Sequence, residues 1–205
     1  MDNTLTVVGL MGAAESGKNT AATLLSESLA TNFDTVVEAA FATLLKQAVY
    51  ELDPVIGWSS SGGIRVSGEV DRLGWDEVKK TYPEARRLLQ RMGTEVGRNL
   101  FGNDFWVTSL GDNVKSRAAG NTLVLITDVR FENEVEFIKS ELGGMVIHLS
   151  RAAGNSLGDE AKKHASEQDL SHLADAEVHN NGTLEELRDS LIGAVSEKFP
   201  EATSK

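Results

Sequence analysis

A glycine-rich stretch at residues 12–20, Gly-Ala-Ala-Glu-Ser-Gly-Lys-Asn-Thr, constrains the fold more than any other feature of the sequence. It follows an apolar run at 5–10 that predicts a buried strand, and it opens a segment at 18–30 where apolar residues recur at helical spacing. Two glycines with four residues between them, followed by Lys18, fit the P-loop pattern. This position between a strand and a helix favours a P-loop over an ordinary glycine-rich turn.

Such a loop binds phosphate because its main-chain N–H groups converge and the following helix adds its positive end. Lys18 would reach the β- and γ-phosphates of ATP. Asn19 stands where the pattern has the Ser or Thr that binds Mg²⁺, so we expect Asn19, Thr20 or Asp128 to hold the metal, directly or through water. The expected ATP-binding residues are Gly12, Ala13, Ala14, Glu15, Ser16, Gly17, Lys18, Asn19 and Thr20.

The rest of the chain continues the alternation of strands and helices. This order predicts an α/β fold with an open parallel sheet of about five strands flanked by helices. Residues 53–69, rich in glycine and serine, indicate a surface loop, and Thr183 with Glu186 predicts a capping box. The expected strands are 35–41, 122–127, 145–149 and 176–179, and the expected helices are 42–52, a pattern from 83 to 100, 105–114, 132–141 and 183–199.

Composition excludes several classes of protein. No apolar run approaches the roughly 20 residues of a membrane span, and residues 1–3 lack the basic region of a signal peptide. The absence of cysteine removes disulfides and thiolate chemistry, and fits a cytoplasmic protein. With 31 acidic against 20 basic residues and a net charge of −11, the chain favours a small phosphorylated ligand over a nucleic acid polymer.

Charged residues follow two further predicted strands. Asp128 and Arg130 come after strand 122–127, at the carboxyl end where α/β sheets bind ligands. Asp128 would hold the metal and Arg130 would clamp the transferring phosphoryl group; the alternative is an Asp–Arg pair that caps the next helix. Arg151 follows strand 145–149 and opens a polar segment, 151–168, which we interpret either as a closing lid or as a surface loop without a role. His164 has no partner histidine at metal-binding spacing, so no zinc site is expected.

A row of arginines, Arg87, Arg91 and Arg98, lies opposite the apolar stripe formed by Leu89, Met92, Val96 and Leu100. Such a row is either a solvated helix face or a set of guanidinium groups that bind the phosphate of an acceptor through paired hydrogen bonds.

Taken together, these blocks resemble the phage-type deoxynucleoside monophosphate kinases, within the P-loop kinases. The resemblance rests on blocks spread over nearly the whole chain: the P-loop through Lys18, Phe41-Ala42 with Lys46, 87–98, 102–106, 127–134, 164–167 and 181–184.

The resemblance implies a P-loop kinase fold: a single domain over residues 1–205 with a mobile lid at 151–168 and a helical monophosphate-binding region at 53–120. It implies transfer of the γ-phosphoryl group of ATP, with Mg²⁺, to a deoxynucleoside monophosphate, in the cytoplasm (that of the host if a phage encodes the chain). Lys18, Asp128, Arg130 and Arg151 would be the catalytic residues. The acceptor site would draw on Lys46, Arg65, Arg87, Arg91, Glu95, Asp104 and Trp106.

Three alternatives stay open: a kinase for another small phosphorylated acceptor, an ATPase or regulatory switch, and a binding module that keeps the loop as a scaffold. A GTPase switch is disfavoured because the Asn/Thr-Lys-x-Asp signature for guanine is missing. The sequence also leaves open a homodimer.

Overall fold

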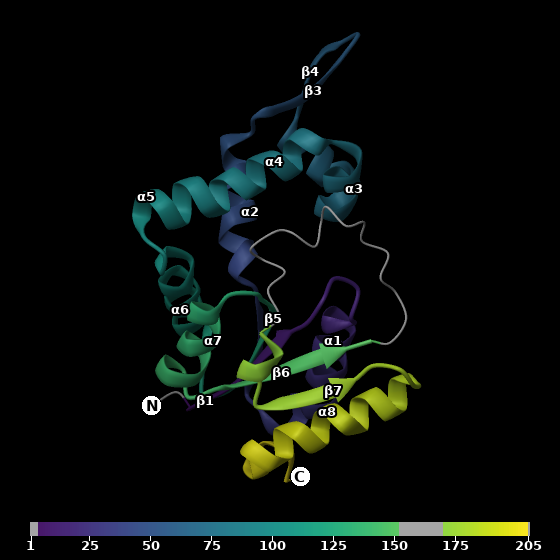
Figure 1. Ribbon diagram of the computed structural model, residues 1–205, viewed down its shortest axis with the longest axis vertical. Helices are drawn as coiled ribbons and strands as arrows, with labels where there is room; N and C mark the ends of the chain where they lie inside the picture. The colour runs from purple at the N-terminus through teal and green to yellow at the C-terminus, as the bar shows by residue number, and fades with distance from the viewer. Residues whose placement is uncertain (1–3, 152–169, 205) are drawn as a thin grey trace. The chain divides into compact units, whose positions relative to one another are not determined.

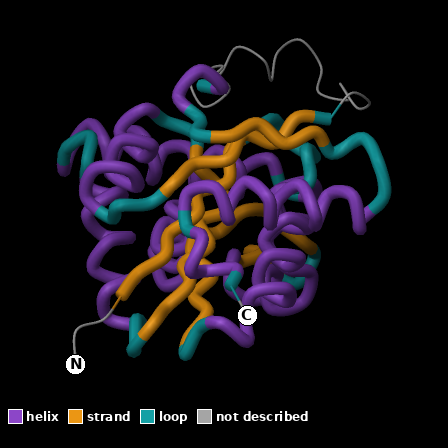
Figure 2. Tube along the Cα trace, turned by 90° about the horizontal axis from the view of Figure 1, so that it is seen from below, coloured by secondary structure: helices purple, strands orange, loops and turns teal. Residues whose placement is uncertain are grey.

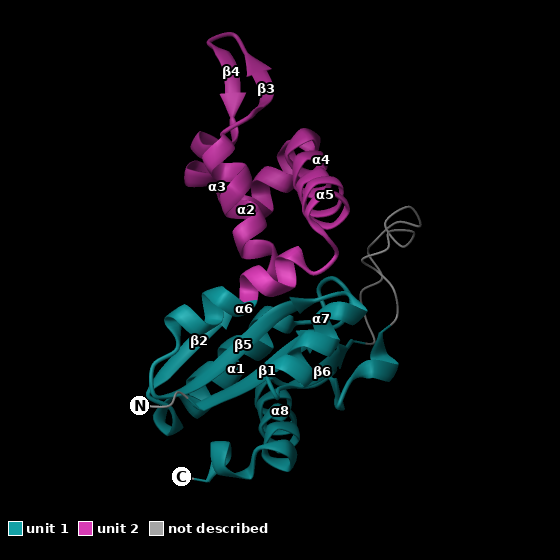
Figure 3. Ribbon diagram, turned by 90° about the vertical axis from the view of Figure 1, so that its left-hand side faces the viewer, with its two compact units in different colours: residues 1–40, 111–205 teal, residues 41–110 magenta. Residues whose placement is uncertain are grey.

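The computed structural model describes residues 4–151 and 170–204. These residues form two compact units, which Figure 3 shows in different colours. We call residues 1–40 with 111–205 the sheet unit, and residues 41–110 the insert unit, because its sequence interrupts that of the sheet unit.

The sheet unit is built on five parallel strands in the order β2-β5-β1-β6-β7, of which Figure 1 labels β1, β5, β6 and β7. The predicted open parallel sheet is therefore confirmed. Strand β1 lies at the centre of this order, and six of its eight residues are buried. A continuous apolar run is typical of a strand that is covered on both faces. The strands are β1 (Thr4–Met11), β2 (Thr35–Ala39), β5 (Asn121–Val129), β6 (Met145–Ser150) and β7 (Ala176–His179).

Helices cover both faces of this sheet (Figure 2). On one face, Leu25 and Leu191 pack with Leu123 and Ile147 in a hydrophobic core. On the other face, a β-carbon on Gly9 of β1 would lie 2.7 Å from the side chain of Ile138. The π-helix that carries Ile138, η3 (Phe137–Glu141), therefore approaches the sheet closely. The helical segments are α1 (Lys18–Leu29), η1 (Ala30–Asn32), α6 (Phe105–Arg117, whose residues from 111 belong to this unit), α7 (Glu132–Glu136), the π-helix η3 (Phe137–Glu141), η6 (Ser171–Leu173), α8 (Leu184–Lys198) and η7 (Pro200–Thr203).

The last helix begins as the sequence predicts. Thr183 Oγ1 accepts the main-chain N–H of Glu186 at 3.2 Å, and Glu186 Oε2 accepts that of Thr183 at 2.8 Å. This reciprocal capping box satisfies two of the N–H groups that a helix start leaves unpaired.

The insert unit has a small core of its own, made of Val49, Ile56, Val66, Val78 and Ala85. Its elements are α2 (Phe41–Leu52), β3 (Val55–Ser59), β4 (Gly62–Arg65), α3 (Val66–Thr81), α4 (Pro83–Arg91), the π-helix η2 (Met92–Arg98) and α5 (Asn99–Phe101).

The expectation of a loop at 53–69 is wrong. Residues 55–65 form an antiparallel hairpin, and α3 begins at Val66. In β3 and β4 only Ile56 is buried, so the hairpin shows no apolar alternation that a sequence pattern would reveal. Asp53 also organises the segment, because its Oδ1 accepts the main-chain N–H of Ser67 at 2.9 Å in the first turn of α3.

The expected stripe along residues 89–100 is only partly correct. Leu89 and Met92 pack against the core of the insert unit, but Leu100 is 70% exposed. The helix changes from α to π geometry at Met92, and this change of pitch turns the later residues to another direction.

Candidate active site

The carboxyl ends of four adjacent strands meet at one edge of the sheet. Gly12 follows β1, Arg130 follows β5, Arg151 follows β6 and Asn180 follows β7. Parallel strands end on the same side, so the structure brings to one edge the loop at 12–20, Asp128, Arg130 and Arg151, which the sequence predicts separately as ligand-binding residues. This edge is where open α/β sheets bind ligands.

The loop between β1 and α1 has the backbone of a phosphate cradle. Gly12 (φ 140°), Glu15 (φ 63°) and Gly17 (φ 101°) all have positive φ. At Gly12 a side chain is excluded, because a β-carbon would lie 2.2 Å from the carbonyl oxygen of Leu149. Alternation between right- and left-handed residues turns successive N–H groups to one side and forms a concavity for an anion.

Helix α1 supplies the second half of the cradle. Its N-cap residue, Gly17, provides no side-chain cap, and its first turn holds no acidic residue. The N–H groups of the first turn, which have no acceptor within the helix, and the positive end of the dipole therefore face the loop. Ser16 adds a buried hydroxyl, whose Oγ has no hydrogen-bond partner among the described residues.

Lys18 lies across this loop. Its Nζ donates to the carbonyl oxygens of Gly12 and Ala13, at 2.8 Å each. These contacts hold the ammonium group over the concavity, where it would neutralise phosphate charge.

Asp128 stands at an irregularity in β5. Gly9 of β1 pairs with Ile126, but Met11 pairs with Val129, so β5 carries one more residue than β1 over this stretch. Such a bulge re-aims side chains and is frequent beside active sites. Asp128 is half-buried, and Arg130 is exposed at the end of the strand.

The turn after β5 is held by a residue that sequence reasoning missed. Glu134 is 2% exposed, and its Oε2 accepts the main-chain N–H groups of Arg130 (2.7 Å) and Phe131 (3.1 Å). A signal for it existed, because Glu134 lies three residues after Phe131, the spacing of the acidic partner in a capping box.

Arg151 is exposed directly after β6. The remainder of the expected lid at 151–168 lies outside the described residues, as does His164.

The seven expected acceptor residues all belong to the insert unit. Arg87 donates to both carboxylate oxygens of Glu84 (2.7 and 2.6 Å), a contact that lowers the pKa of the Glu84 carboxyl. Arg91 Nε donates to Glu95 Oε2 at 2.9 Å, so these two predicted residues do meet. Lys46 is half-buried on α2, and Asp104 is exposed before α6. Arg65 ends β4, where its Nη1 donates to the carbonyl oxygen of Asp53 at 2.8 Å.

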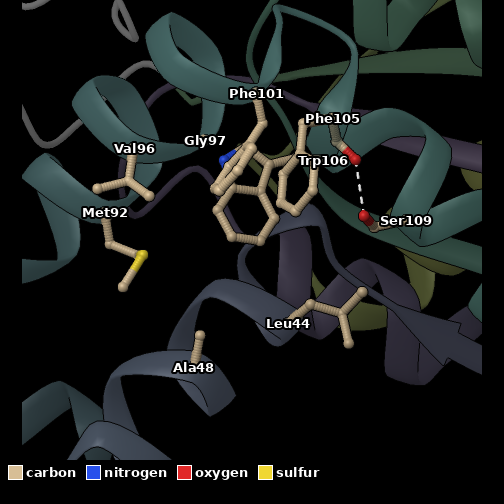
Figure 4. A pocket seen from close by; sticks show the side chains of 9 residues that line it. All are labelled: Leu44, Ala48, Met92, Val96, Gly97, Phe101, Phe105, Trp106 and Ser109. Atoms are coloured by element: carbon tan, nitrogen blue, oxygen red, sulfur yellow. Dashed lines mark hydrogen bonds between the residues drawn. The ribbon is translucent and has the colours of Figure 1, made fainter.

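Trp106 is placed differently from these charged residues. It is 7% exposed, and its indole N–H donates to the carbonyl oxygen of Gly93 at 2.9 Å. It lines an apolar pocket of about 410 Å³ within the insert unit (Figure 4). Among the described residues, this pocket is lined by Leu44, Ala48, Met92, Val96, Gly97, Phe101, Phe105, Trp106 and Ser109, which include none of the other predicted acceptor residues.

Comparison with known proteins identifies the family of this chain. A family model described as deoxynucleotide monophosphate kinase matches residues 69–191, more than half of the chain. A putative deoxynucleotide monophosphate kinase of Acanthamoeba polyphaga mimivirus is 33% identical over 213 residues, which cover 93% of this chain and 96% of that protein. The chain belongs to the deoxynucleotide monophosphate kinase family. The predicted family and the predicted enzyme class, a kinase that acts on small nucleotides, are confirmed.

Two further matches are more distant or partial. The deoxynucleotide monophosphate kinase of Escherichia phage RB69 is 34% identical over 104 residues, which cover 50% of this chain and 41% of that protein. A crystal structure of shikimate kinase from Aquifex aeolicus is 13% identical, covers 95% of this chain and 99% of that chain, and superposes with a TM-score of 0.46.

The oxygen donors near the loop fit a magnesium ion that is held chiefly by water and substrate. Mg²⁺ in kinases keeps several waters and is bound by one or two carboxylates together with phosphate oxygens. Asp128 supplies a carboxylate, and Asn19 and Thr20 supply exposed oxygens in the first turn of α1. No cluster of three or more His, Asp or Glu residues suited to a metal ion occurs within 4–151 and 170–204.

No helix in the described part of the chain is long and apolar enough to cross a membrane.

Proposed function

We propose that this kinase transfers the γ-phosphoryl group of ATP, with Mg²⁺, to a deoxynucleoside 5′-monophosphate and releases the diphosphate. The observation that carries the ATP assignment is the cradle of residues 12–20, with its positive-φ residues, its uncapped helix and Lys18 above it. Family membership supports a deoxynucleotide as the acceptor.

Phosphoryl transfer requires positioning and charge neutralisation rather than a covalent intermediate. The N–H groups of the loop would fix the β-phosphate, while Lys18, Arg130 and Arg151 would surround the migrating group. Asp128 would bind the metal or its waters. The metal, when bound, would supply further positive charge to neutralise the phosphates.

We propose that the acceptor binds through the 53–120 region, most of which lies in the insert unit. Arg87 and Arg91 already pair with carboxylates. A phosphate would therefore bind by exchange with Glu84 or Glu95, in the bidentate geometry that arginine offers to both groups. Their exposed ion pairs make this exchange inexpensive.

The deciding experiment is an ADP-release assay with ATP and Mg²⁺ against dAMP, dGMP, dCMP, dTMP and no acceptor. We expect turnover that requires a deoxynucleoside monophosphate. Lys18→Ala should lower kcat/KM by about 100-fold or more, as the loss of one charge-stabilising donor does elsewhere. Lys198→Ala, at an exposed lysine in the last turn of α8 and outside the 53–120 region, is the matched control and should leave turnover unchanged.

Equal turnover with and without acceptor would replace the proposal with an ATPase. Turnover with a different phosphorylated acceptor would keep the loop assignment and change the substrate. Activity that survives Lys18→Ala would overturn the loop assignment itself.

A further inference from the structure

Asn180, the residue that follows β7, contacts the phosphate loop from the far end of the sequence. Its side-chain Nδ2 donates to the carbonyl oxygen of Ser16 at 2.9 Å. Its main-chain N–H donates to the carbonyl oxygen of Ser150 at 2.8 Å. The backbone of Asn180 is thus fixed to the end of β6, and its side chain reaches from there to the loop.

The contact with the loop is close as well as polar. A β-carbon built on Gly17 would lie 2.3 Å from Asn180 Nδ2. Gly17 also has a φ of 101°, a conformation that glycine adopts without strain. The amide of Asn180 therefore occupies the space that a side chain at this position would need.

The planarity of the peptide bond gives this contact a direction. In a trans peptide the C=O and the following N–H point in opposite directions. Because Asn180 holds the carbonyl of Ser16 toward itself, the N–H of Gly17 points the other way. Gly17 is the N-cap of α1, and the positive N-terminal end of this helix belongs to the cradle.

We propose that Asn180 is a positioning residue for nucleotide binding, which fixes the Ser16–Gly17 peptide so that the N–H of Gly17 faces the nucleotide phosphates. The proposal rests on the proposed function of the loop. It assigns to Asn180 no contact with substrate, so its effect passes through the peptide that it holds.

A purely structural role would make a different prediction, and the chain contains a matched case. Asn32 Nδ2 donates to the carbonyl oxygen of Ala202 at 2.9 Å, also within the sheet unit and across 170 residues. Like the bond of Asn180, it joins an asparagine Nδ2 to a main-chain carbonyl oxygen at 2.9 Å. Asn32, however, lies after the C-terminal end of α1, away from the loop.

The test compares Asn180→Leu with Asn32→Leu in the full chain. Leucine has nearly the shape of asparagine, adds no charge and cannot donate, so each variant leaves one carbonyl unpaired. Binding of ATP with Mg²⁺ is measured by calorimetry without acceptor, and the melting temperature is measured in parallel. We expect both variants to melt earlier. Asn180→Leu should weaken ATP binding about tenfold, as the loss of one oriented donor implies, and Asn32→Leu should change it less than about twofold.

Kinetics give a second readout. Asn180→Leu should raise the KM for ATP while kcat at saturating ATP and the KM for the acceptor stay close to wild type, because a fixed loop donor contributes uniform binding. Equal ATP affinities for the two leucine variants would overturn the proposal, as would a fall in kcat with unchanged ATP affinity. If Asn180→Leu does not fold, Asn180→Ala is subject to the same criteria. Failure of the proposed function would look different, since wild type would not bind ATP or Lys18→Ala would bind it as well as wild type.

Discussion

Gly97 packs against the indole of Trp106 so closely that a β-carbon on this glycine would lie 2.1 Å from Nε1. The two residues come from the π-helix η2 and from α6, and the same indole nitrogen donates to Gly93 one turn earlier. The glycine at 97 thus allows the π-helix and the tryptophan to approach each other, whereas a β-carbon on Gly93 would lie 2.9 Å from the side chain of Leu45.

Gly97→Ala should therefore displace Trp106 and break its bond to Gly93. We expect a loss of about 1–3 kcal/mol in the free energy of unfolding, the usual effect of overpacking. Urea denaturation followed by tryptophan fluorescence measures it. Gly193→Ala is the control, because this helical glycine has open space around its β-carbon position and the change should stabilise α8 by about 0.5–1 kcal/mol. A Gly97→Ala variant as stable as wild type would contradict the packing.

Gly12→Ala should abolish the phosphate cradle. The new β-carbon meets the carbonyl of Leu149, and a φ of 140° is strained for alanine. A strain of about 3 kcal/mol relieved by moving the loop corresponds to about 100-fold weaker ATP binding. Calorimetric titration with ATP and Mg²⁺ tests this. Retention of wild-type affinity would show that the loop does not need this conformation.

Glu134→Ala should leave the N–H groups of Arg130 and Phe131 without their acceptor. We expect a loss of about 3 kcal/mol in stability, since buried donors without partners are costly, and a fall in kcat/KM because Arg130 is no longer held. Glu134→Gln keeps one carbonyl oxygen and should recover most of the stability. Equal stability of wild type and the alanine variant in urea would contradict the assignment.

Asp53 should make the insert unit sensitive to acid. Its pKa is lowered from 3.8, chiefly by the main-chain N–H of Ser67. A carboxyl with a depressed folded-state pKa stabilises fully above its unfolded pKa, and this contribution is lost as the pH falls through the folded value. The melting temperature should therefore drop more steeply below about pH 4 in wild type than in Asp53→Asn, which cannot ionise. If the melting temperatures of wild type and Asp53→Asn fell by the same amount between pH 5 and pH 2, the role of this ionisation would be contradicted.

The parts of the fold that the sequence predicts are those with local signals. The phosphate cradle consists of consecutive residues, and the two residues of the capping box, Thr183 and Glu186, are three positions apart. Strands β5 and β6 are short, largely apolar segments. The parallel sheet then brings Lys18, Asp128, Arg130 and Arg151 to one edge without further information.

The contacts that sequence reasoning missed have no local period. Asn180 meets Ser16 across 164 residues through one polar side chain, and nothing near either residue indicates the pairing. The hairpin of β3 and β4 buries only Ile56, so its strands are concealed among glycine and serine. Within the π-helix at Met92–Arg98, Gly93 and Gly97 lie close to the side chains of Leu45 and Trp106, and such packing is a tertiary property that no local pattern reveals.

The interruption of the sheet unit by residues 41–110 has a consequence for the nascent chain. The first two strands made, β1 and β2, are not neighbours, because β5 lies between them. Until β5 has been translated, β1 and β2 have no neighbouring strand in this sheet. During this time the insert unit emerges as one continuous segment with its own core, and it can fold from contacts that are close in sequence. The sheet, by contrast, is complete only after β5, β6 and β7 have been made. We therefore expect ATP to have no influence on folding until β7 has been translated, and then to stabilise the sheet unit by binding its completed cradle.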